Sequence, residues 1–222
     1  MSPFRRIAIG LWVAVFLLTG ILFGTGWRPW TVNNTVNTAA NSSEESQQTD
    51  PNTVSGSAVN IGDPLPDITL ADLYGQPQSL STWSGRTLLI NFWATWCAPC
   101  RQEMPLLEQF QQAVDPAQVQ VVGIAIDRLD PVMRFLGETG VTYPNLVGQM
   151  DATRIAERFV SDLALPLSVV AAPDGTVLAV HMGELHAGDL KQIATAADGL
   201  ATGTLSPSQV FDTLKLGAAQ NQ

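Results

Sequence analysis

The chain has 222 residues, a formal net charge of −9 and a hydrophobic content of 45%. This length fits one ordinary domain with additional segments, and the composition excludes a disordered or collagen-like chain. All 20 acidic residues lie after Arg28, so the segment that follows carries 8 − 20 = −12 charges, which argues against nucleic acid as a partner.

The N-terminal segment has the features of a membrane anchor. Residues 7–27 are uncharged and mostly apolar, and about 20 such residues cross the hydrocarbon of a bilayer as a helix. Arg5 and Arg6 precede this segment and Arg28 follows it, so the charge bias predicts a cytoplasmic N-terminus and a chain that continues outside. A cleaved signal peptide is the alternative, but the apolar run is long and no small-residue cleavage site follows it closely. We therefore predict a transmembrane helix within residues 1–30.

The remaining segments divide into a linker, a folded domain and a tail. Residues 31–60 are rich in Asn, Thr, Ser and Gln and contain no Lys, Arg or aromatic residue, which predicts a flexible linker. The domain is assigned to residues 61–200. The tail, residues 201–222, contains the capping-box pattern Ser206–Gln209, which predicts a short helix over residues 207–216.

The domain alternates strand and helix patterns. Residues 87–92 and 119–126 are near-continuous apolar runs, typical of strands buried on both faces. Residues 98–114, between them, have a helical pattern. The other predicted elements, in chain order, are strands 67–71 and 78–80, helices 131–137 and 152–160, strands 166–172 and 176–182, and helix 188–198. This order predicts an α/β fold with a central mixed sheet flanked by helices.

Both cysteines of the chain lie in one motif, Trp96-Cys97-Ala98-Pro99-Cys100, between a predicted buried strand and a predicted helix. The first turn of a helix has free N–H groups and a partial positive charge, which stabilise the thiolate form of Cys97. Because the thiolate is the nucleophile of thiol–disulfide exchange, Cys97 is the expected attacking thiol. Cys100 lies one turn further on, close enough to displace the substrate and form a disulfide with Cys97. Pro99 suits a helix start because it has no N–H.

Two other interpretations of the cysteine pair are weaker. Two cysteines cannot complete a zinc site, and neither His181 nor His186 is near them in the sequence. A purely structural disulfide across this small loop would constrain the unfolded chain little. The strand–motif–helix order therefore favours redox chemistry at Cys97 and Cys100. We expect no metal and no bound cofactor, since the chain has no flavin or nicotinamide motif.

Residues 91–105 (NFWATWCAPCRQEMP) resemble the active-site segment of TlpA/ResA-type thiol–disulfide oxidoreductases. These are membrane-tethered, extracytoplasmic proteins of bacteria with a thioredoxin fold. Residues 61–67 (IGDPLPD) resemble the entry to the family's domain, and residues 165–168 with 173–175 resemble its cis-proline strand and hairpin. The resemblance spans about residues 61–185 and implies a thioredoxin-like fold.

The resemblance implies roles for individual residues. Cys97 would be the attacking thiol and Cys100 the resolving thiol. Glu103 falls where the family keeps an active-site carboxylate; it shares a helix face with Cys100 and would take the proton of that thiol, the alternative being a solvated helix charge. Pro166 corresponds to the cis-proline, which would present the Leu165 backbone to an extended substrate segment.

Further positions near the motif bear on substrate contacts and proton transfer. Trp96 is expected to form an exposed apolar platform beside the attacking sulfur. Both Trp96 and Pro99 are predicted to bind the substrate. Leu167 stands where the family commonly has a small hydroxyl residue, which changes the expected substrate contacts rather than the chemistry. Asn91 stands where thioredoxins place a buried acid, so proton transfer is expected to depend on Glu103.

The resemblance implies a membrane-anchored reductase that acts on cysteine-containing client proteins outside the cytoplasm. The family's usual clients are apocytochrome c and the copper-site proteins of oxidase assembly. The expected location is the bacterial inner membrane, with one membrane span and the catalytic domain on the periplasmic side. Because that compartment is oxidising, the electrons must come from a membrane electron-donor protein.

Three alternatives to a reductase stay open. A peroxiredoxin-like peroxidase is disfavoured, because Ile90 and Ala94 occupy the places where a peroxidase site has Pro and Thr. A copper-binding assembly factor would use the cysteine pair as ligands. A donor of disulfides would use the same pair in the opposite direction, since redox poise depends on how well each thiolate is stabilised.

Overall fold

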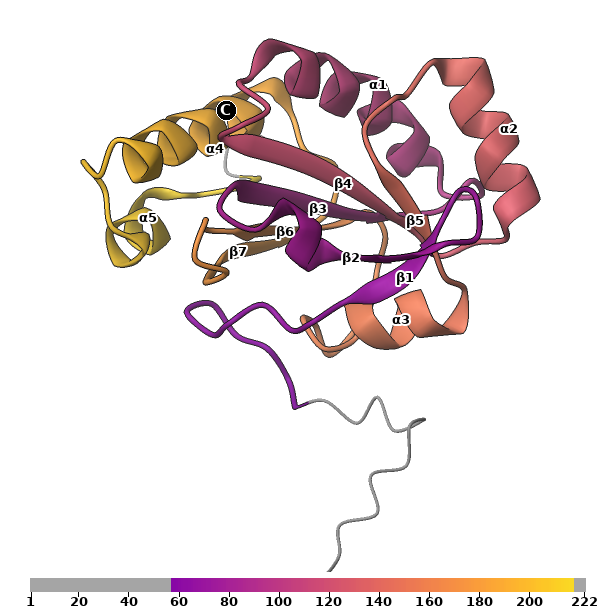
Figure 1. Ribbon diagram of the computed structural model, residues 1–222, viewed down its shortest axis with the longest axis horizontal. Coiled ribbons are helices and arrows are strands. Elements are labelled where there is room, and N and C mark those ends of the chain that lie inside the picture. The colour runs from indigo at the N-terminus through magenta and orange to yellow at the C-terminus, as the bar shows by residue number, and fades with distance from the viewer. Residues whose placement is uncertain (1–56, 218–222) are drawn as a thin grey trace, which may run out of the picture. The chain divides into compact units, whose positions relative to one another are not determined.

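A computed structural model describes residues 57–217. The anchor predicted within residues 1–30 and most of the linker predicted over residues 31–60 lie outside this range. Within the described range no helix combines the length and the apolar character that a membrane span needs. Residues 57–217 form a mixed sheet with helices on both faces, which confirms the predicted α/β class (Figure 1).

The sheet has seven strands in the order β2-β1-β5-β4-β3-β6-β7. The strands are β1 (Thr69–Asp72), β2 (Pro77–Ser79), β3 (Thr87–Trp93), β4 (Val119–Ala125), β5 (Asn145–Val147), β6 (Leu167–Ala171) and β7 (Val177–Met182). Strands β3, β4 and β5 are parallel to one another, and the other neighbouring pairs are antiparallel. All seven residues of β3 and of β4 are buried, as the apolar runs predicted.

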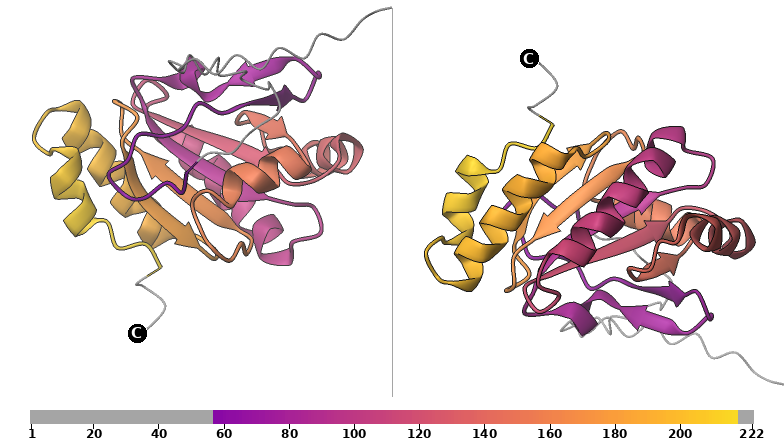
Figure 2. Two further views of the ribbon diagram at one scale, coloured as in Figure 1. Left: turned by 90° about the horizontal axis from the view of Figure 1, so that it is seen from below. Right: turned by 90° about the horizontal axis from the view of Figure 1, so that it is seen from above.

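Helices cover both faces of this sheet (Figure 2). They are α1 (Ala98–Ala113), α2 (Leu129–Thr139), α3 (Met150–Ala156), α4 (Ala187–Ala201) and α5 (Pro207–Thr213), with a 3-10 helix, η1, over Leu80–Trp83. Successive residues of β3 alternate between two apolar cores. Leu89 and Trp93 pack with α1, α2 and α4, and Ile90 and Phe92 pack with α3 and η1. The sheet thus separates the two cores, and the cysteine-bearing helix lies on one of them.

Some predicted bounds were wrong for local physical reasons. The strand predicted over residues 78–80 ends at Ser79, because the Ser79 side chain caps η1 by accepting a hydrogen bond from the Ser81 N–H. The helix predicted over residues 152–160 spans only Met150–Ala156, although Phe159 beyond it is buried and extends the apolar pattern. Strand β5 was not predicted, since three residues are too few to display an alternating pattern.

Residues at both ends of the described range pack onto the sheet. Val59, assigned to the linker from the sequence, is buried, and its N–H donates to the Arg158 carbonyl at 2.7 Å. Helix α5 contacts β7, and its Val210 is fully buried, as is most of Leu214 just beyond the helix. These contacts make the segment after residue 200 part of the apolar core that α1 and α4 also form.

Candidate active site

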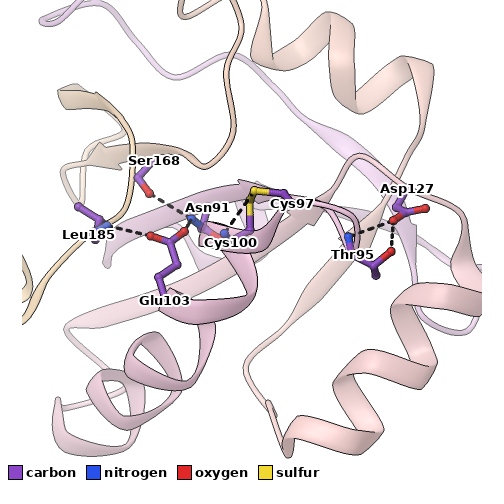
Figure 3. Close-up of a disulfide and its surroundings, with 8 residues drawn as sticks. All are labelled: Asn91, Thr95, Cys97, Cys100, Glu103, Asp127, Ser168 and Leu185. Atoms are coloured by element: carbon purple, nitrogen blue, oxygen red, sulfur yellow. Dashed lines mark hydrogen bonds between the residues drawn. A yellow bond between two sulfur atoms is a disulfide. The ribbon is translucent and has the colours of Figure 1, made fainter.

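The two cysteines lie where β3 has ended and α1 begins (Figure 3). Their sulfur atoms are bonded to each other, and their Cα atoms are 5.3 Å apart. Cys97 is the N-cap of α1, and its Sγ accepts a hydrogen bond from the Cys100 N–H at 3.2 Å. Cys97 is 6% exposed and Cys100 is 0% exposed. A substrate can therefore reach Cys97, whereas Cys100 is accessible only from within the site.

The sulfur of Cys97 occupies the position that a capping oxygen takes at other helix starts. The first N–H groups of a helix have no intrahelical partner, and here one of them is directed at this sulfur. Pro99, in the first turn, has no N–H that would need a partner. The helix start therefore offers a negatively charged sulfur both a hydrogen bond and the positive end of the helix dipole.

Glu103 lies one turn beyond Cys100 on α1 and is only 1% exposed. Its Oε1 accepts a hydrogen bond from Asn91 Nδ2 at 2.7 Å, and its Oε2 accepts one from the Leu185 N–H at 2.9 Å. Burial raises the pKa of Glu103 to about 7, although these two hydrogen bonds act in the opposite direction and the negative Glu184 nearby acts in the same direction as burial. A carboxyl group with this pKa can both take up and release a proton near neutral pH.

The loop between β3 and Cys97 is held from the neighbouring strand. Asp127, which follows β4, accepts hydrogen bonds from the Thr95 N–H at 3.0 Å and from the Thr95 hydroxyl at 2.5 Å. Burial alone would raise the pKa of Asp127, but the hydrogen bonds from Thr95 and Arg128 outweigh it and keep that pKa below its ordinary value. The ionised Asp127 side chain thus fixes the loop that places Cys97.

Pro166 stands directly before β6, and the Leu165–Pro166 peptide bond is cis, as the resemblance implied. Because β6 is antiparallel to β3, the start of β6 and the end of β3 lie at the same edge of the sheet, where the cysteine motif follows. The Pro166 carbonyl accepts a hydrogen bond from the Gly183 N–H at 2.9 Å. Pro166 is buried and Leu165 half-buried.

The residues expected to contact a substrate differ in exposure. Trp96 is 67% exposed and Pro99 is also exposed, both beside the accessible cysteine. Met182 is 47% exposed and pairs with Leu167, directly after Pro166. Apolar side chains are therefore exposed both on the α1 side and on the β7 side of this end of the sheet.

Sequence reasoning did not identify Asp127, Leu185 and Ser168 as parts of the site. Asp127 had one usable signal, since it follows a predicted parallel strand at the edge where the cysteines lie. Leu185 contributes only its backbone N–H, which no residue type reveals. Ser168 contacts Asn91, and that contact depends on the pairing of β3 with β6. Among the described residues, no group of three or more His, Cys, Asp or Glu side chains is placed to hold a metal ion.

Comparisons with known proteins agree with this geometry. The Redoxin family model matches residues 60–197. Thioredoxin-like protein YneN of Bacillus subtilis (strain 168) is 31% identical over 137 residues, which cover 60% of this chain and 78% of that protein. Thiol-disulfide oxidoreductase ResA of Geobacillus thermodenitrificans is 28% identical over 137 residues, 61% of this chain and 76% of that one. The crystal structure of a thiol:disulfide interchange protein of the thioredoxin family from Chlorobium tepidum TLS matches with a TM-score of 0.56 at 28% identity, over 61% of this chain and 96% of that one.

Proposed function

The chain belongs to the Redoxin family and is a thiol–disulfide oxidoreductase with a thioredoxin-like fold, and from this premise we propose that it is a membrane-tethered reductase of protein disulfides outside the cytoplasm. The resemblance to TlpA/ResA-type proteins that the sequence indicated is thereby confirmed. The proposal adds three points to the family assignment: the direction of electron flow, the membrane anchor within residues 1–30, and the nature of the client.

The observation that best supports this function is that Cys97 and Cys100 lie in different environments. The more accessible sulfur is the one at the helix N-cap, where a backbone N–H is directed at it. The inaccessible sulfur is followed after one turn by a buried carboxyl group whose pKa is about 7. This arrangement suits a two-step exchange, in which the first sulfur acts as a thiolate and the second must lose a proton inside the protein.

In the first step, the reduced enzyme attacks a client disulfide. The Cys97 thiolate forms a bond to one client sulfur, the client S–S bond breaks, and the other client sulfur leaves as a thiolate. In the second step, the Cys100 thiol gives its proton to the Glu103 carboxylate, and its sulfur attacks Cys97 Sγ. The mixed disulfide breaks and the second client thiolate leaves. The client gains two electrons, and the Cys97–Cys100 disulfide is formed.

The clients and the electron donor follow from the proposed location. The proposed clients are proteins whose disulfides must be reduced to thiols before these proteins can bind haem or copper. The enzyme is then reoxidised at each turnover, and a membrane electron-donor protein must reduce the Cys97–Cys100 disulfide again. The anchor would keep the domain near that donor.

The reduction potential of the Cys97/Cys100 couple, measured against a glutathione or dithiothreitol buffer, tests the direction. We expect a value close to that of thioredoxin, about −270 mV, whereas a value of about −120 mV would indicate a donor of disulfides. The anchor is tested separately by expressing the full chain in a bacterium. Recovery of the domain in the soluble periplasmic fraction alone would contradict tethering, and turnover of hydrogen peroxide would support a peroxidase instead.

A further inference from the structure

A row with three buried polar side chains crosses the sheet beneath α1. The strand pairing places Ser168 of β6 opposite Asn91 of β3, Asn91 opposite Gly123 of β4, and Gly123 opposite Asn145 of β5. Residues directly opposite one another point to the same face of a sheet. Asn91 is at the centre of this row and is fully buried, as is Ser168.

The Asn91 amide connects the row to Glu103 (Figure 3). Its Nδ2 donates to Glu103 Oε1 at 2.7 Å and to Ser168 Oγ at 3.2 Å. Both hydrogens of the amide are thus in use. The Oδ1 atom at the other end of the amide is buried and has no hydrogen-bond partner within residues 57–217.

This arrangement satisfies only one of the two protonation states of Glu103. A carboxylate accepts hydrogen bonds, and Asn91 Nδ2 and the Leu185 N–H supply them. A carboxylic acid has an O–H that needs an acceptor, and Nδ2 has no lone pair to offer. A buried donor left without an acceptor costs about 1–3 kcal/mol. The exchange mechanism nevertheless requires that Glu103 hold a proton for part of each cycle.

We propose that Asn91 is a positioning residue for Glu103, and that its amide turns by half a rotation about the Cβ–Cγ bond when Glu103 takes up a proton, with the Ser168 hydroxyl bonded to it in both orientations. The proposal rests on the proposed role of Glu103 as proton acceptor. After the turn, Oδ1 occupies the place of Nδ2 and accepts hydrogen bonds from the Glu103 O–H and from the Ser168 O–H.

The chemistry of the two side chains permits this exchange. An amide presents two donors at one end and two acceptor lone pairs at the other, and its last torsion is broad and nearly twofold. A hydroxyl can accept in one state and donate in the other. The amide makes two hydrogen bonds before and after the turn, because Nδ2 gives up two, Oδ1 gains two, and Oδ1 had none to lose. The two N–H groups move to the end that Oδ1 leaves, so the cost of leaving them without acceptors opposes the gain at Glu103 and Ser168. An aspartate at position 91 would lack the donors, and an alanine at position 168 would lack both functions.

Several titratable groups surround Glu103. On α1 itself, Cys100 lies one turn before it, and Glu108 is held by hydrogen bonds from Thr142 and Tyr143. Burial, followed by the charges of Glu103 and Glu108, raises the pKa of Tyr143 well above its ordinary value, so its hydroxyl stays neutral. Glu184, before α4, adds a negative charge nearby.

His181 of β7 is the remaining titratable group along the row, since it lies opposite Ser168 in the strand pairing. Its Nε2 is buried and has no hydrogen-bond partner among the described residues. A measurement on the amide itself is therefore needed to separate an event at Glu103 from one at His181.

Neutron diffraction of deuterated crystals of the oxidised protein at pH 5 and at pH 9 tests the turn directly. At pH 9 we expect deuterium on the Asn91 atom that faces Glu103 and none on the Glu103 carboxylate. At pH 5 we expect the opposite, with a deuterated carboxyl group facing a bare oxygen of Asn91. The same Asn91 orientation at both pH values would overturn the proposal. Neither reading depends on the direction of electron flow or on the client, so the proposed reductase function can fail independently.

A carboxyl ¹³C NMR titration of the variant Asn91→Leu tests the positioning role. Hydrogen bonds to an ionised group are about twice as strong as hydrogen bonds between neutral groups. The substitution removes the partner of Glu103 in both its ionised and its neutral form, so it destabilises the carboxylate more than the carboxylic acid. The midpoint of Glu103 should therefore rise above the value of about 7. Thr87→Val is the matched control, because Thr87 faces the same side of β3 and its buried Oγ1 has no partner among the described residues. An unchanged midpoint in Asn91→Leu, or an equal rise in the control, would reject the role.

Discussion

Asp127 accepts two hydrogen bonds from Thr95, one from its backbone N–H at 3.0 Å and one from its hydroxyl at 2.5 Å. The two residues are 32 positions apart and come from the ends of two adjacent parallel strands. Thr95 is two residues before Cys97, so this contact sets the path of the chain into α1. A carboxylate that receives both donors holds the loop more firmly than a single bond would.

Replacing Asp127 with Asn should lower the free energy of unfolding at pH 7 by about 1–2 kcal/mol, because two charge-assisted hydrogen bonds become weaker. The folded-state pKa of Asp127 is lowered, so this contribution is present above the unfolded pKa and is lost as the pH falls through the folded one. Urea unfolding at pH 7 and at pH 3 should show that the difference in free energy of unfolding between the variant and the wild-type protein is smaller at pH 3. Asp212→Asn, at an exposed position in α5, is the control; an equal loss there would argue against the loop contact.

The buried Glu103 should make stability fall as the pH rises. Its folded pKa of about 7 lies above the ordinary glutamate value of 4.5, so the folded state binds the proton more tightly and loses that advantage between these two pH values. The difference corresponds to on the order of 3 kcal/mol. Denaturant unfolding should show that the free energy of unfolding of the wild-type protein falls from pH 5 to pH 8, and that it falls much less in Glu103→Gln. The exposed Glu138 on α2 supplies the control, Glu138→Gln, which should decline like the original.

The same Glu103→Gln substitution should slow the second exchange step. Without a carboxylate, the Cys100 thiol has no internal proton acceptor, and loss of a general base costs about 100-fold or more. Stopped-flow release of the client thiol from the mixed disulfide measures this step. The rate of the first step, attack by Cys97, should change far less. Equal slowing of both steps would point to a structural disturbance instead.

Cys100→Ser should trap the mixed disulfide. The accessible Cys97 can still attack a client disulfide, but no second sulfur remains to displace the client. Mass spectrometry of the intact protein after incubation with a disulfide-bonded peptide should show one adduct per chain, removable by dithiothreitol. Cys97→Ser should show none within the same time, because Cys100 is fully buried. An adduct on Cys97→Ser as abundant as on Cys100→Ser would reverse the assignment.

Gly123→Ala should destabilise the domain by about 1–3 kcal/mol through overpacking. A Cβ atom at Gly123 would lie 2.0 Å from Asn145 Oδ1, which accepts the hydrogen bond of the Trp93 indole N–H. Thermal unfolding measures the loss. Gly137→Ala in α2 is the opposite case, since no atom lies within 4 Å of its added Cβ; there we expect stabilisation of about 0.5–1 kcal/mol. A tolerated Gly123→Ala would mean that the row beneath α1 can rearrange.

Much of the protein could be predicted from local patterns in the sequence. Buried strands, the helix after the cysteine motif and the turn before β7 depend on residues close together in the chain, where periodicity and turn chemistry act. The redox pair was predicted for the same reason, because Cys97 and Cys100 are three residues apart at a helix start. The position of Glu103 on the helix also followed from its spacing to Cys100.

The environment of Glu103 was decided by the tertiary structure alone. Its hydrogen-bond partners Asn91 and Leu185 are 12 and 82 residues away in the sequence, and Ser168 is 77 residues from Asn91. These contacts exist because strand register places Ser168 opposite Asn91 and because the segment before α4 passes beside α1. A pKa responds to burial and to donors within a few ångströms, so a sequence can place a carboxyl group on a helix, but only the folded chain determines when it holds a proton.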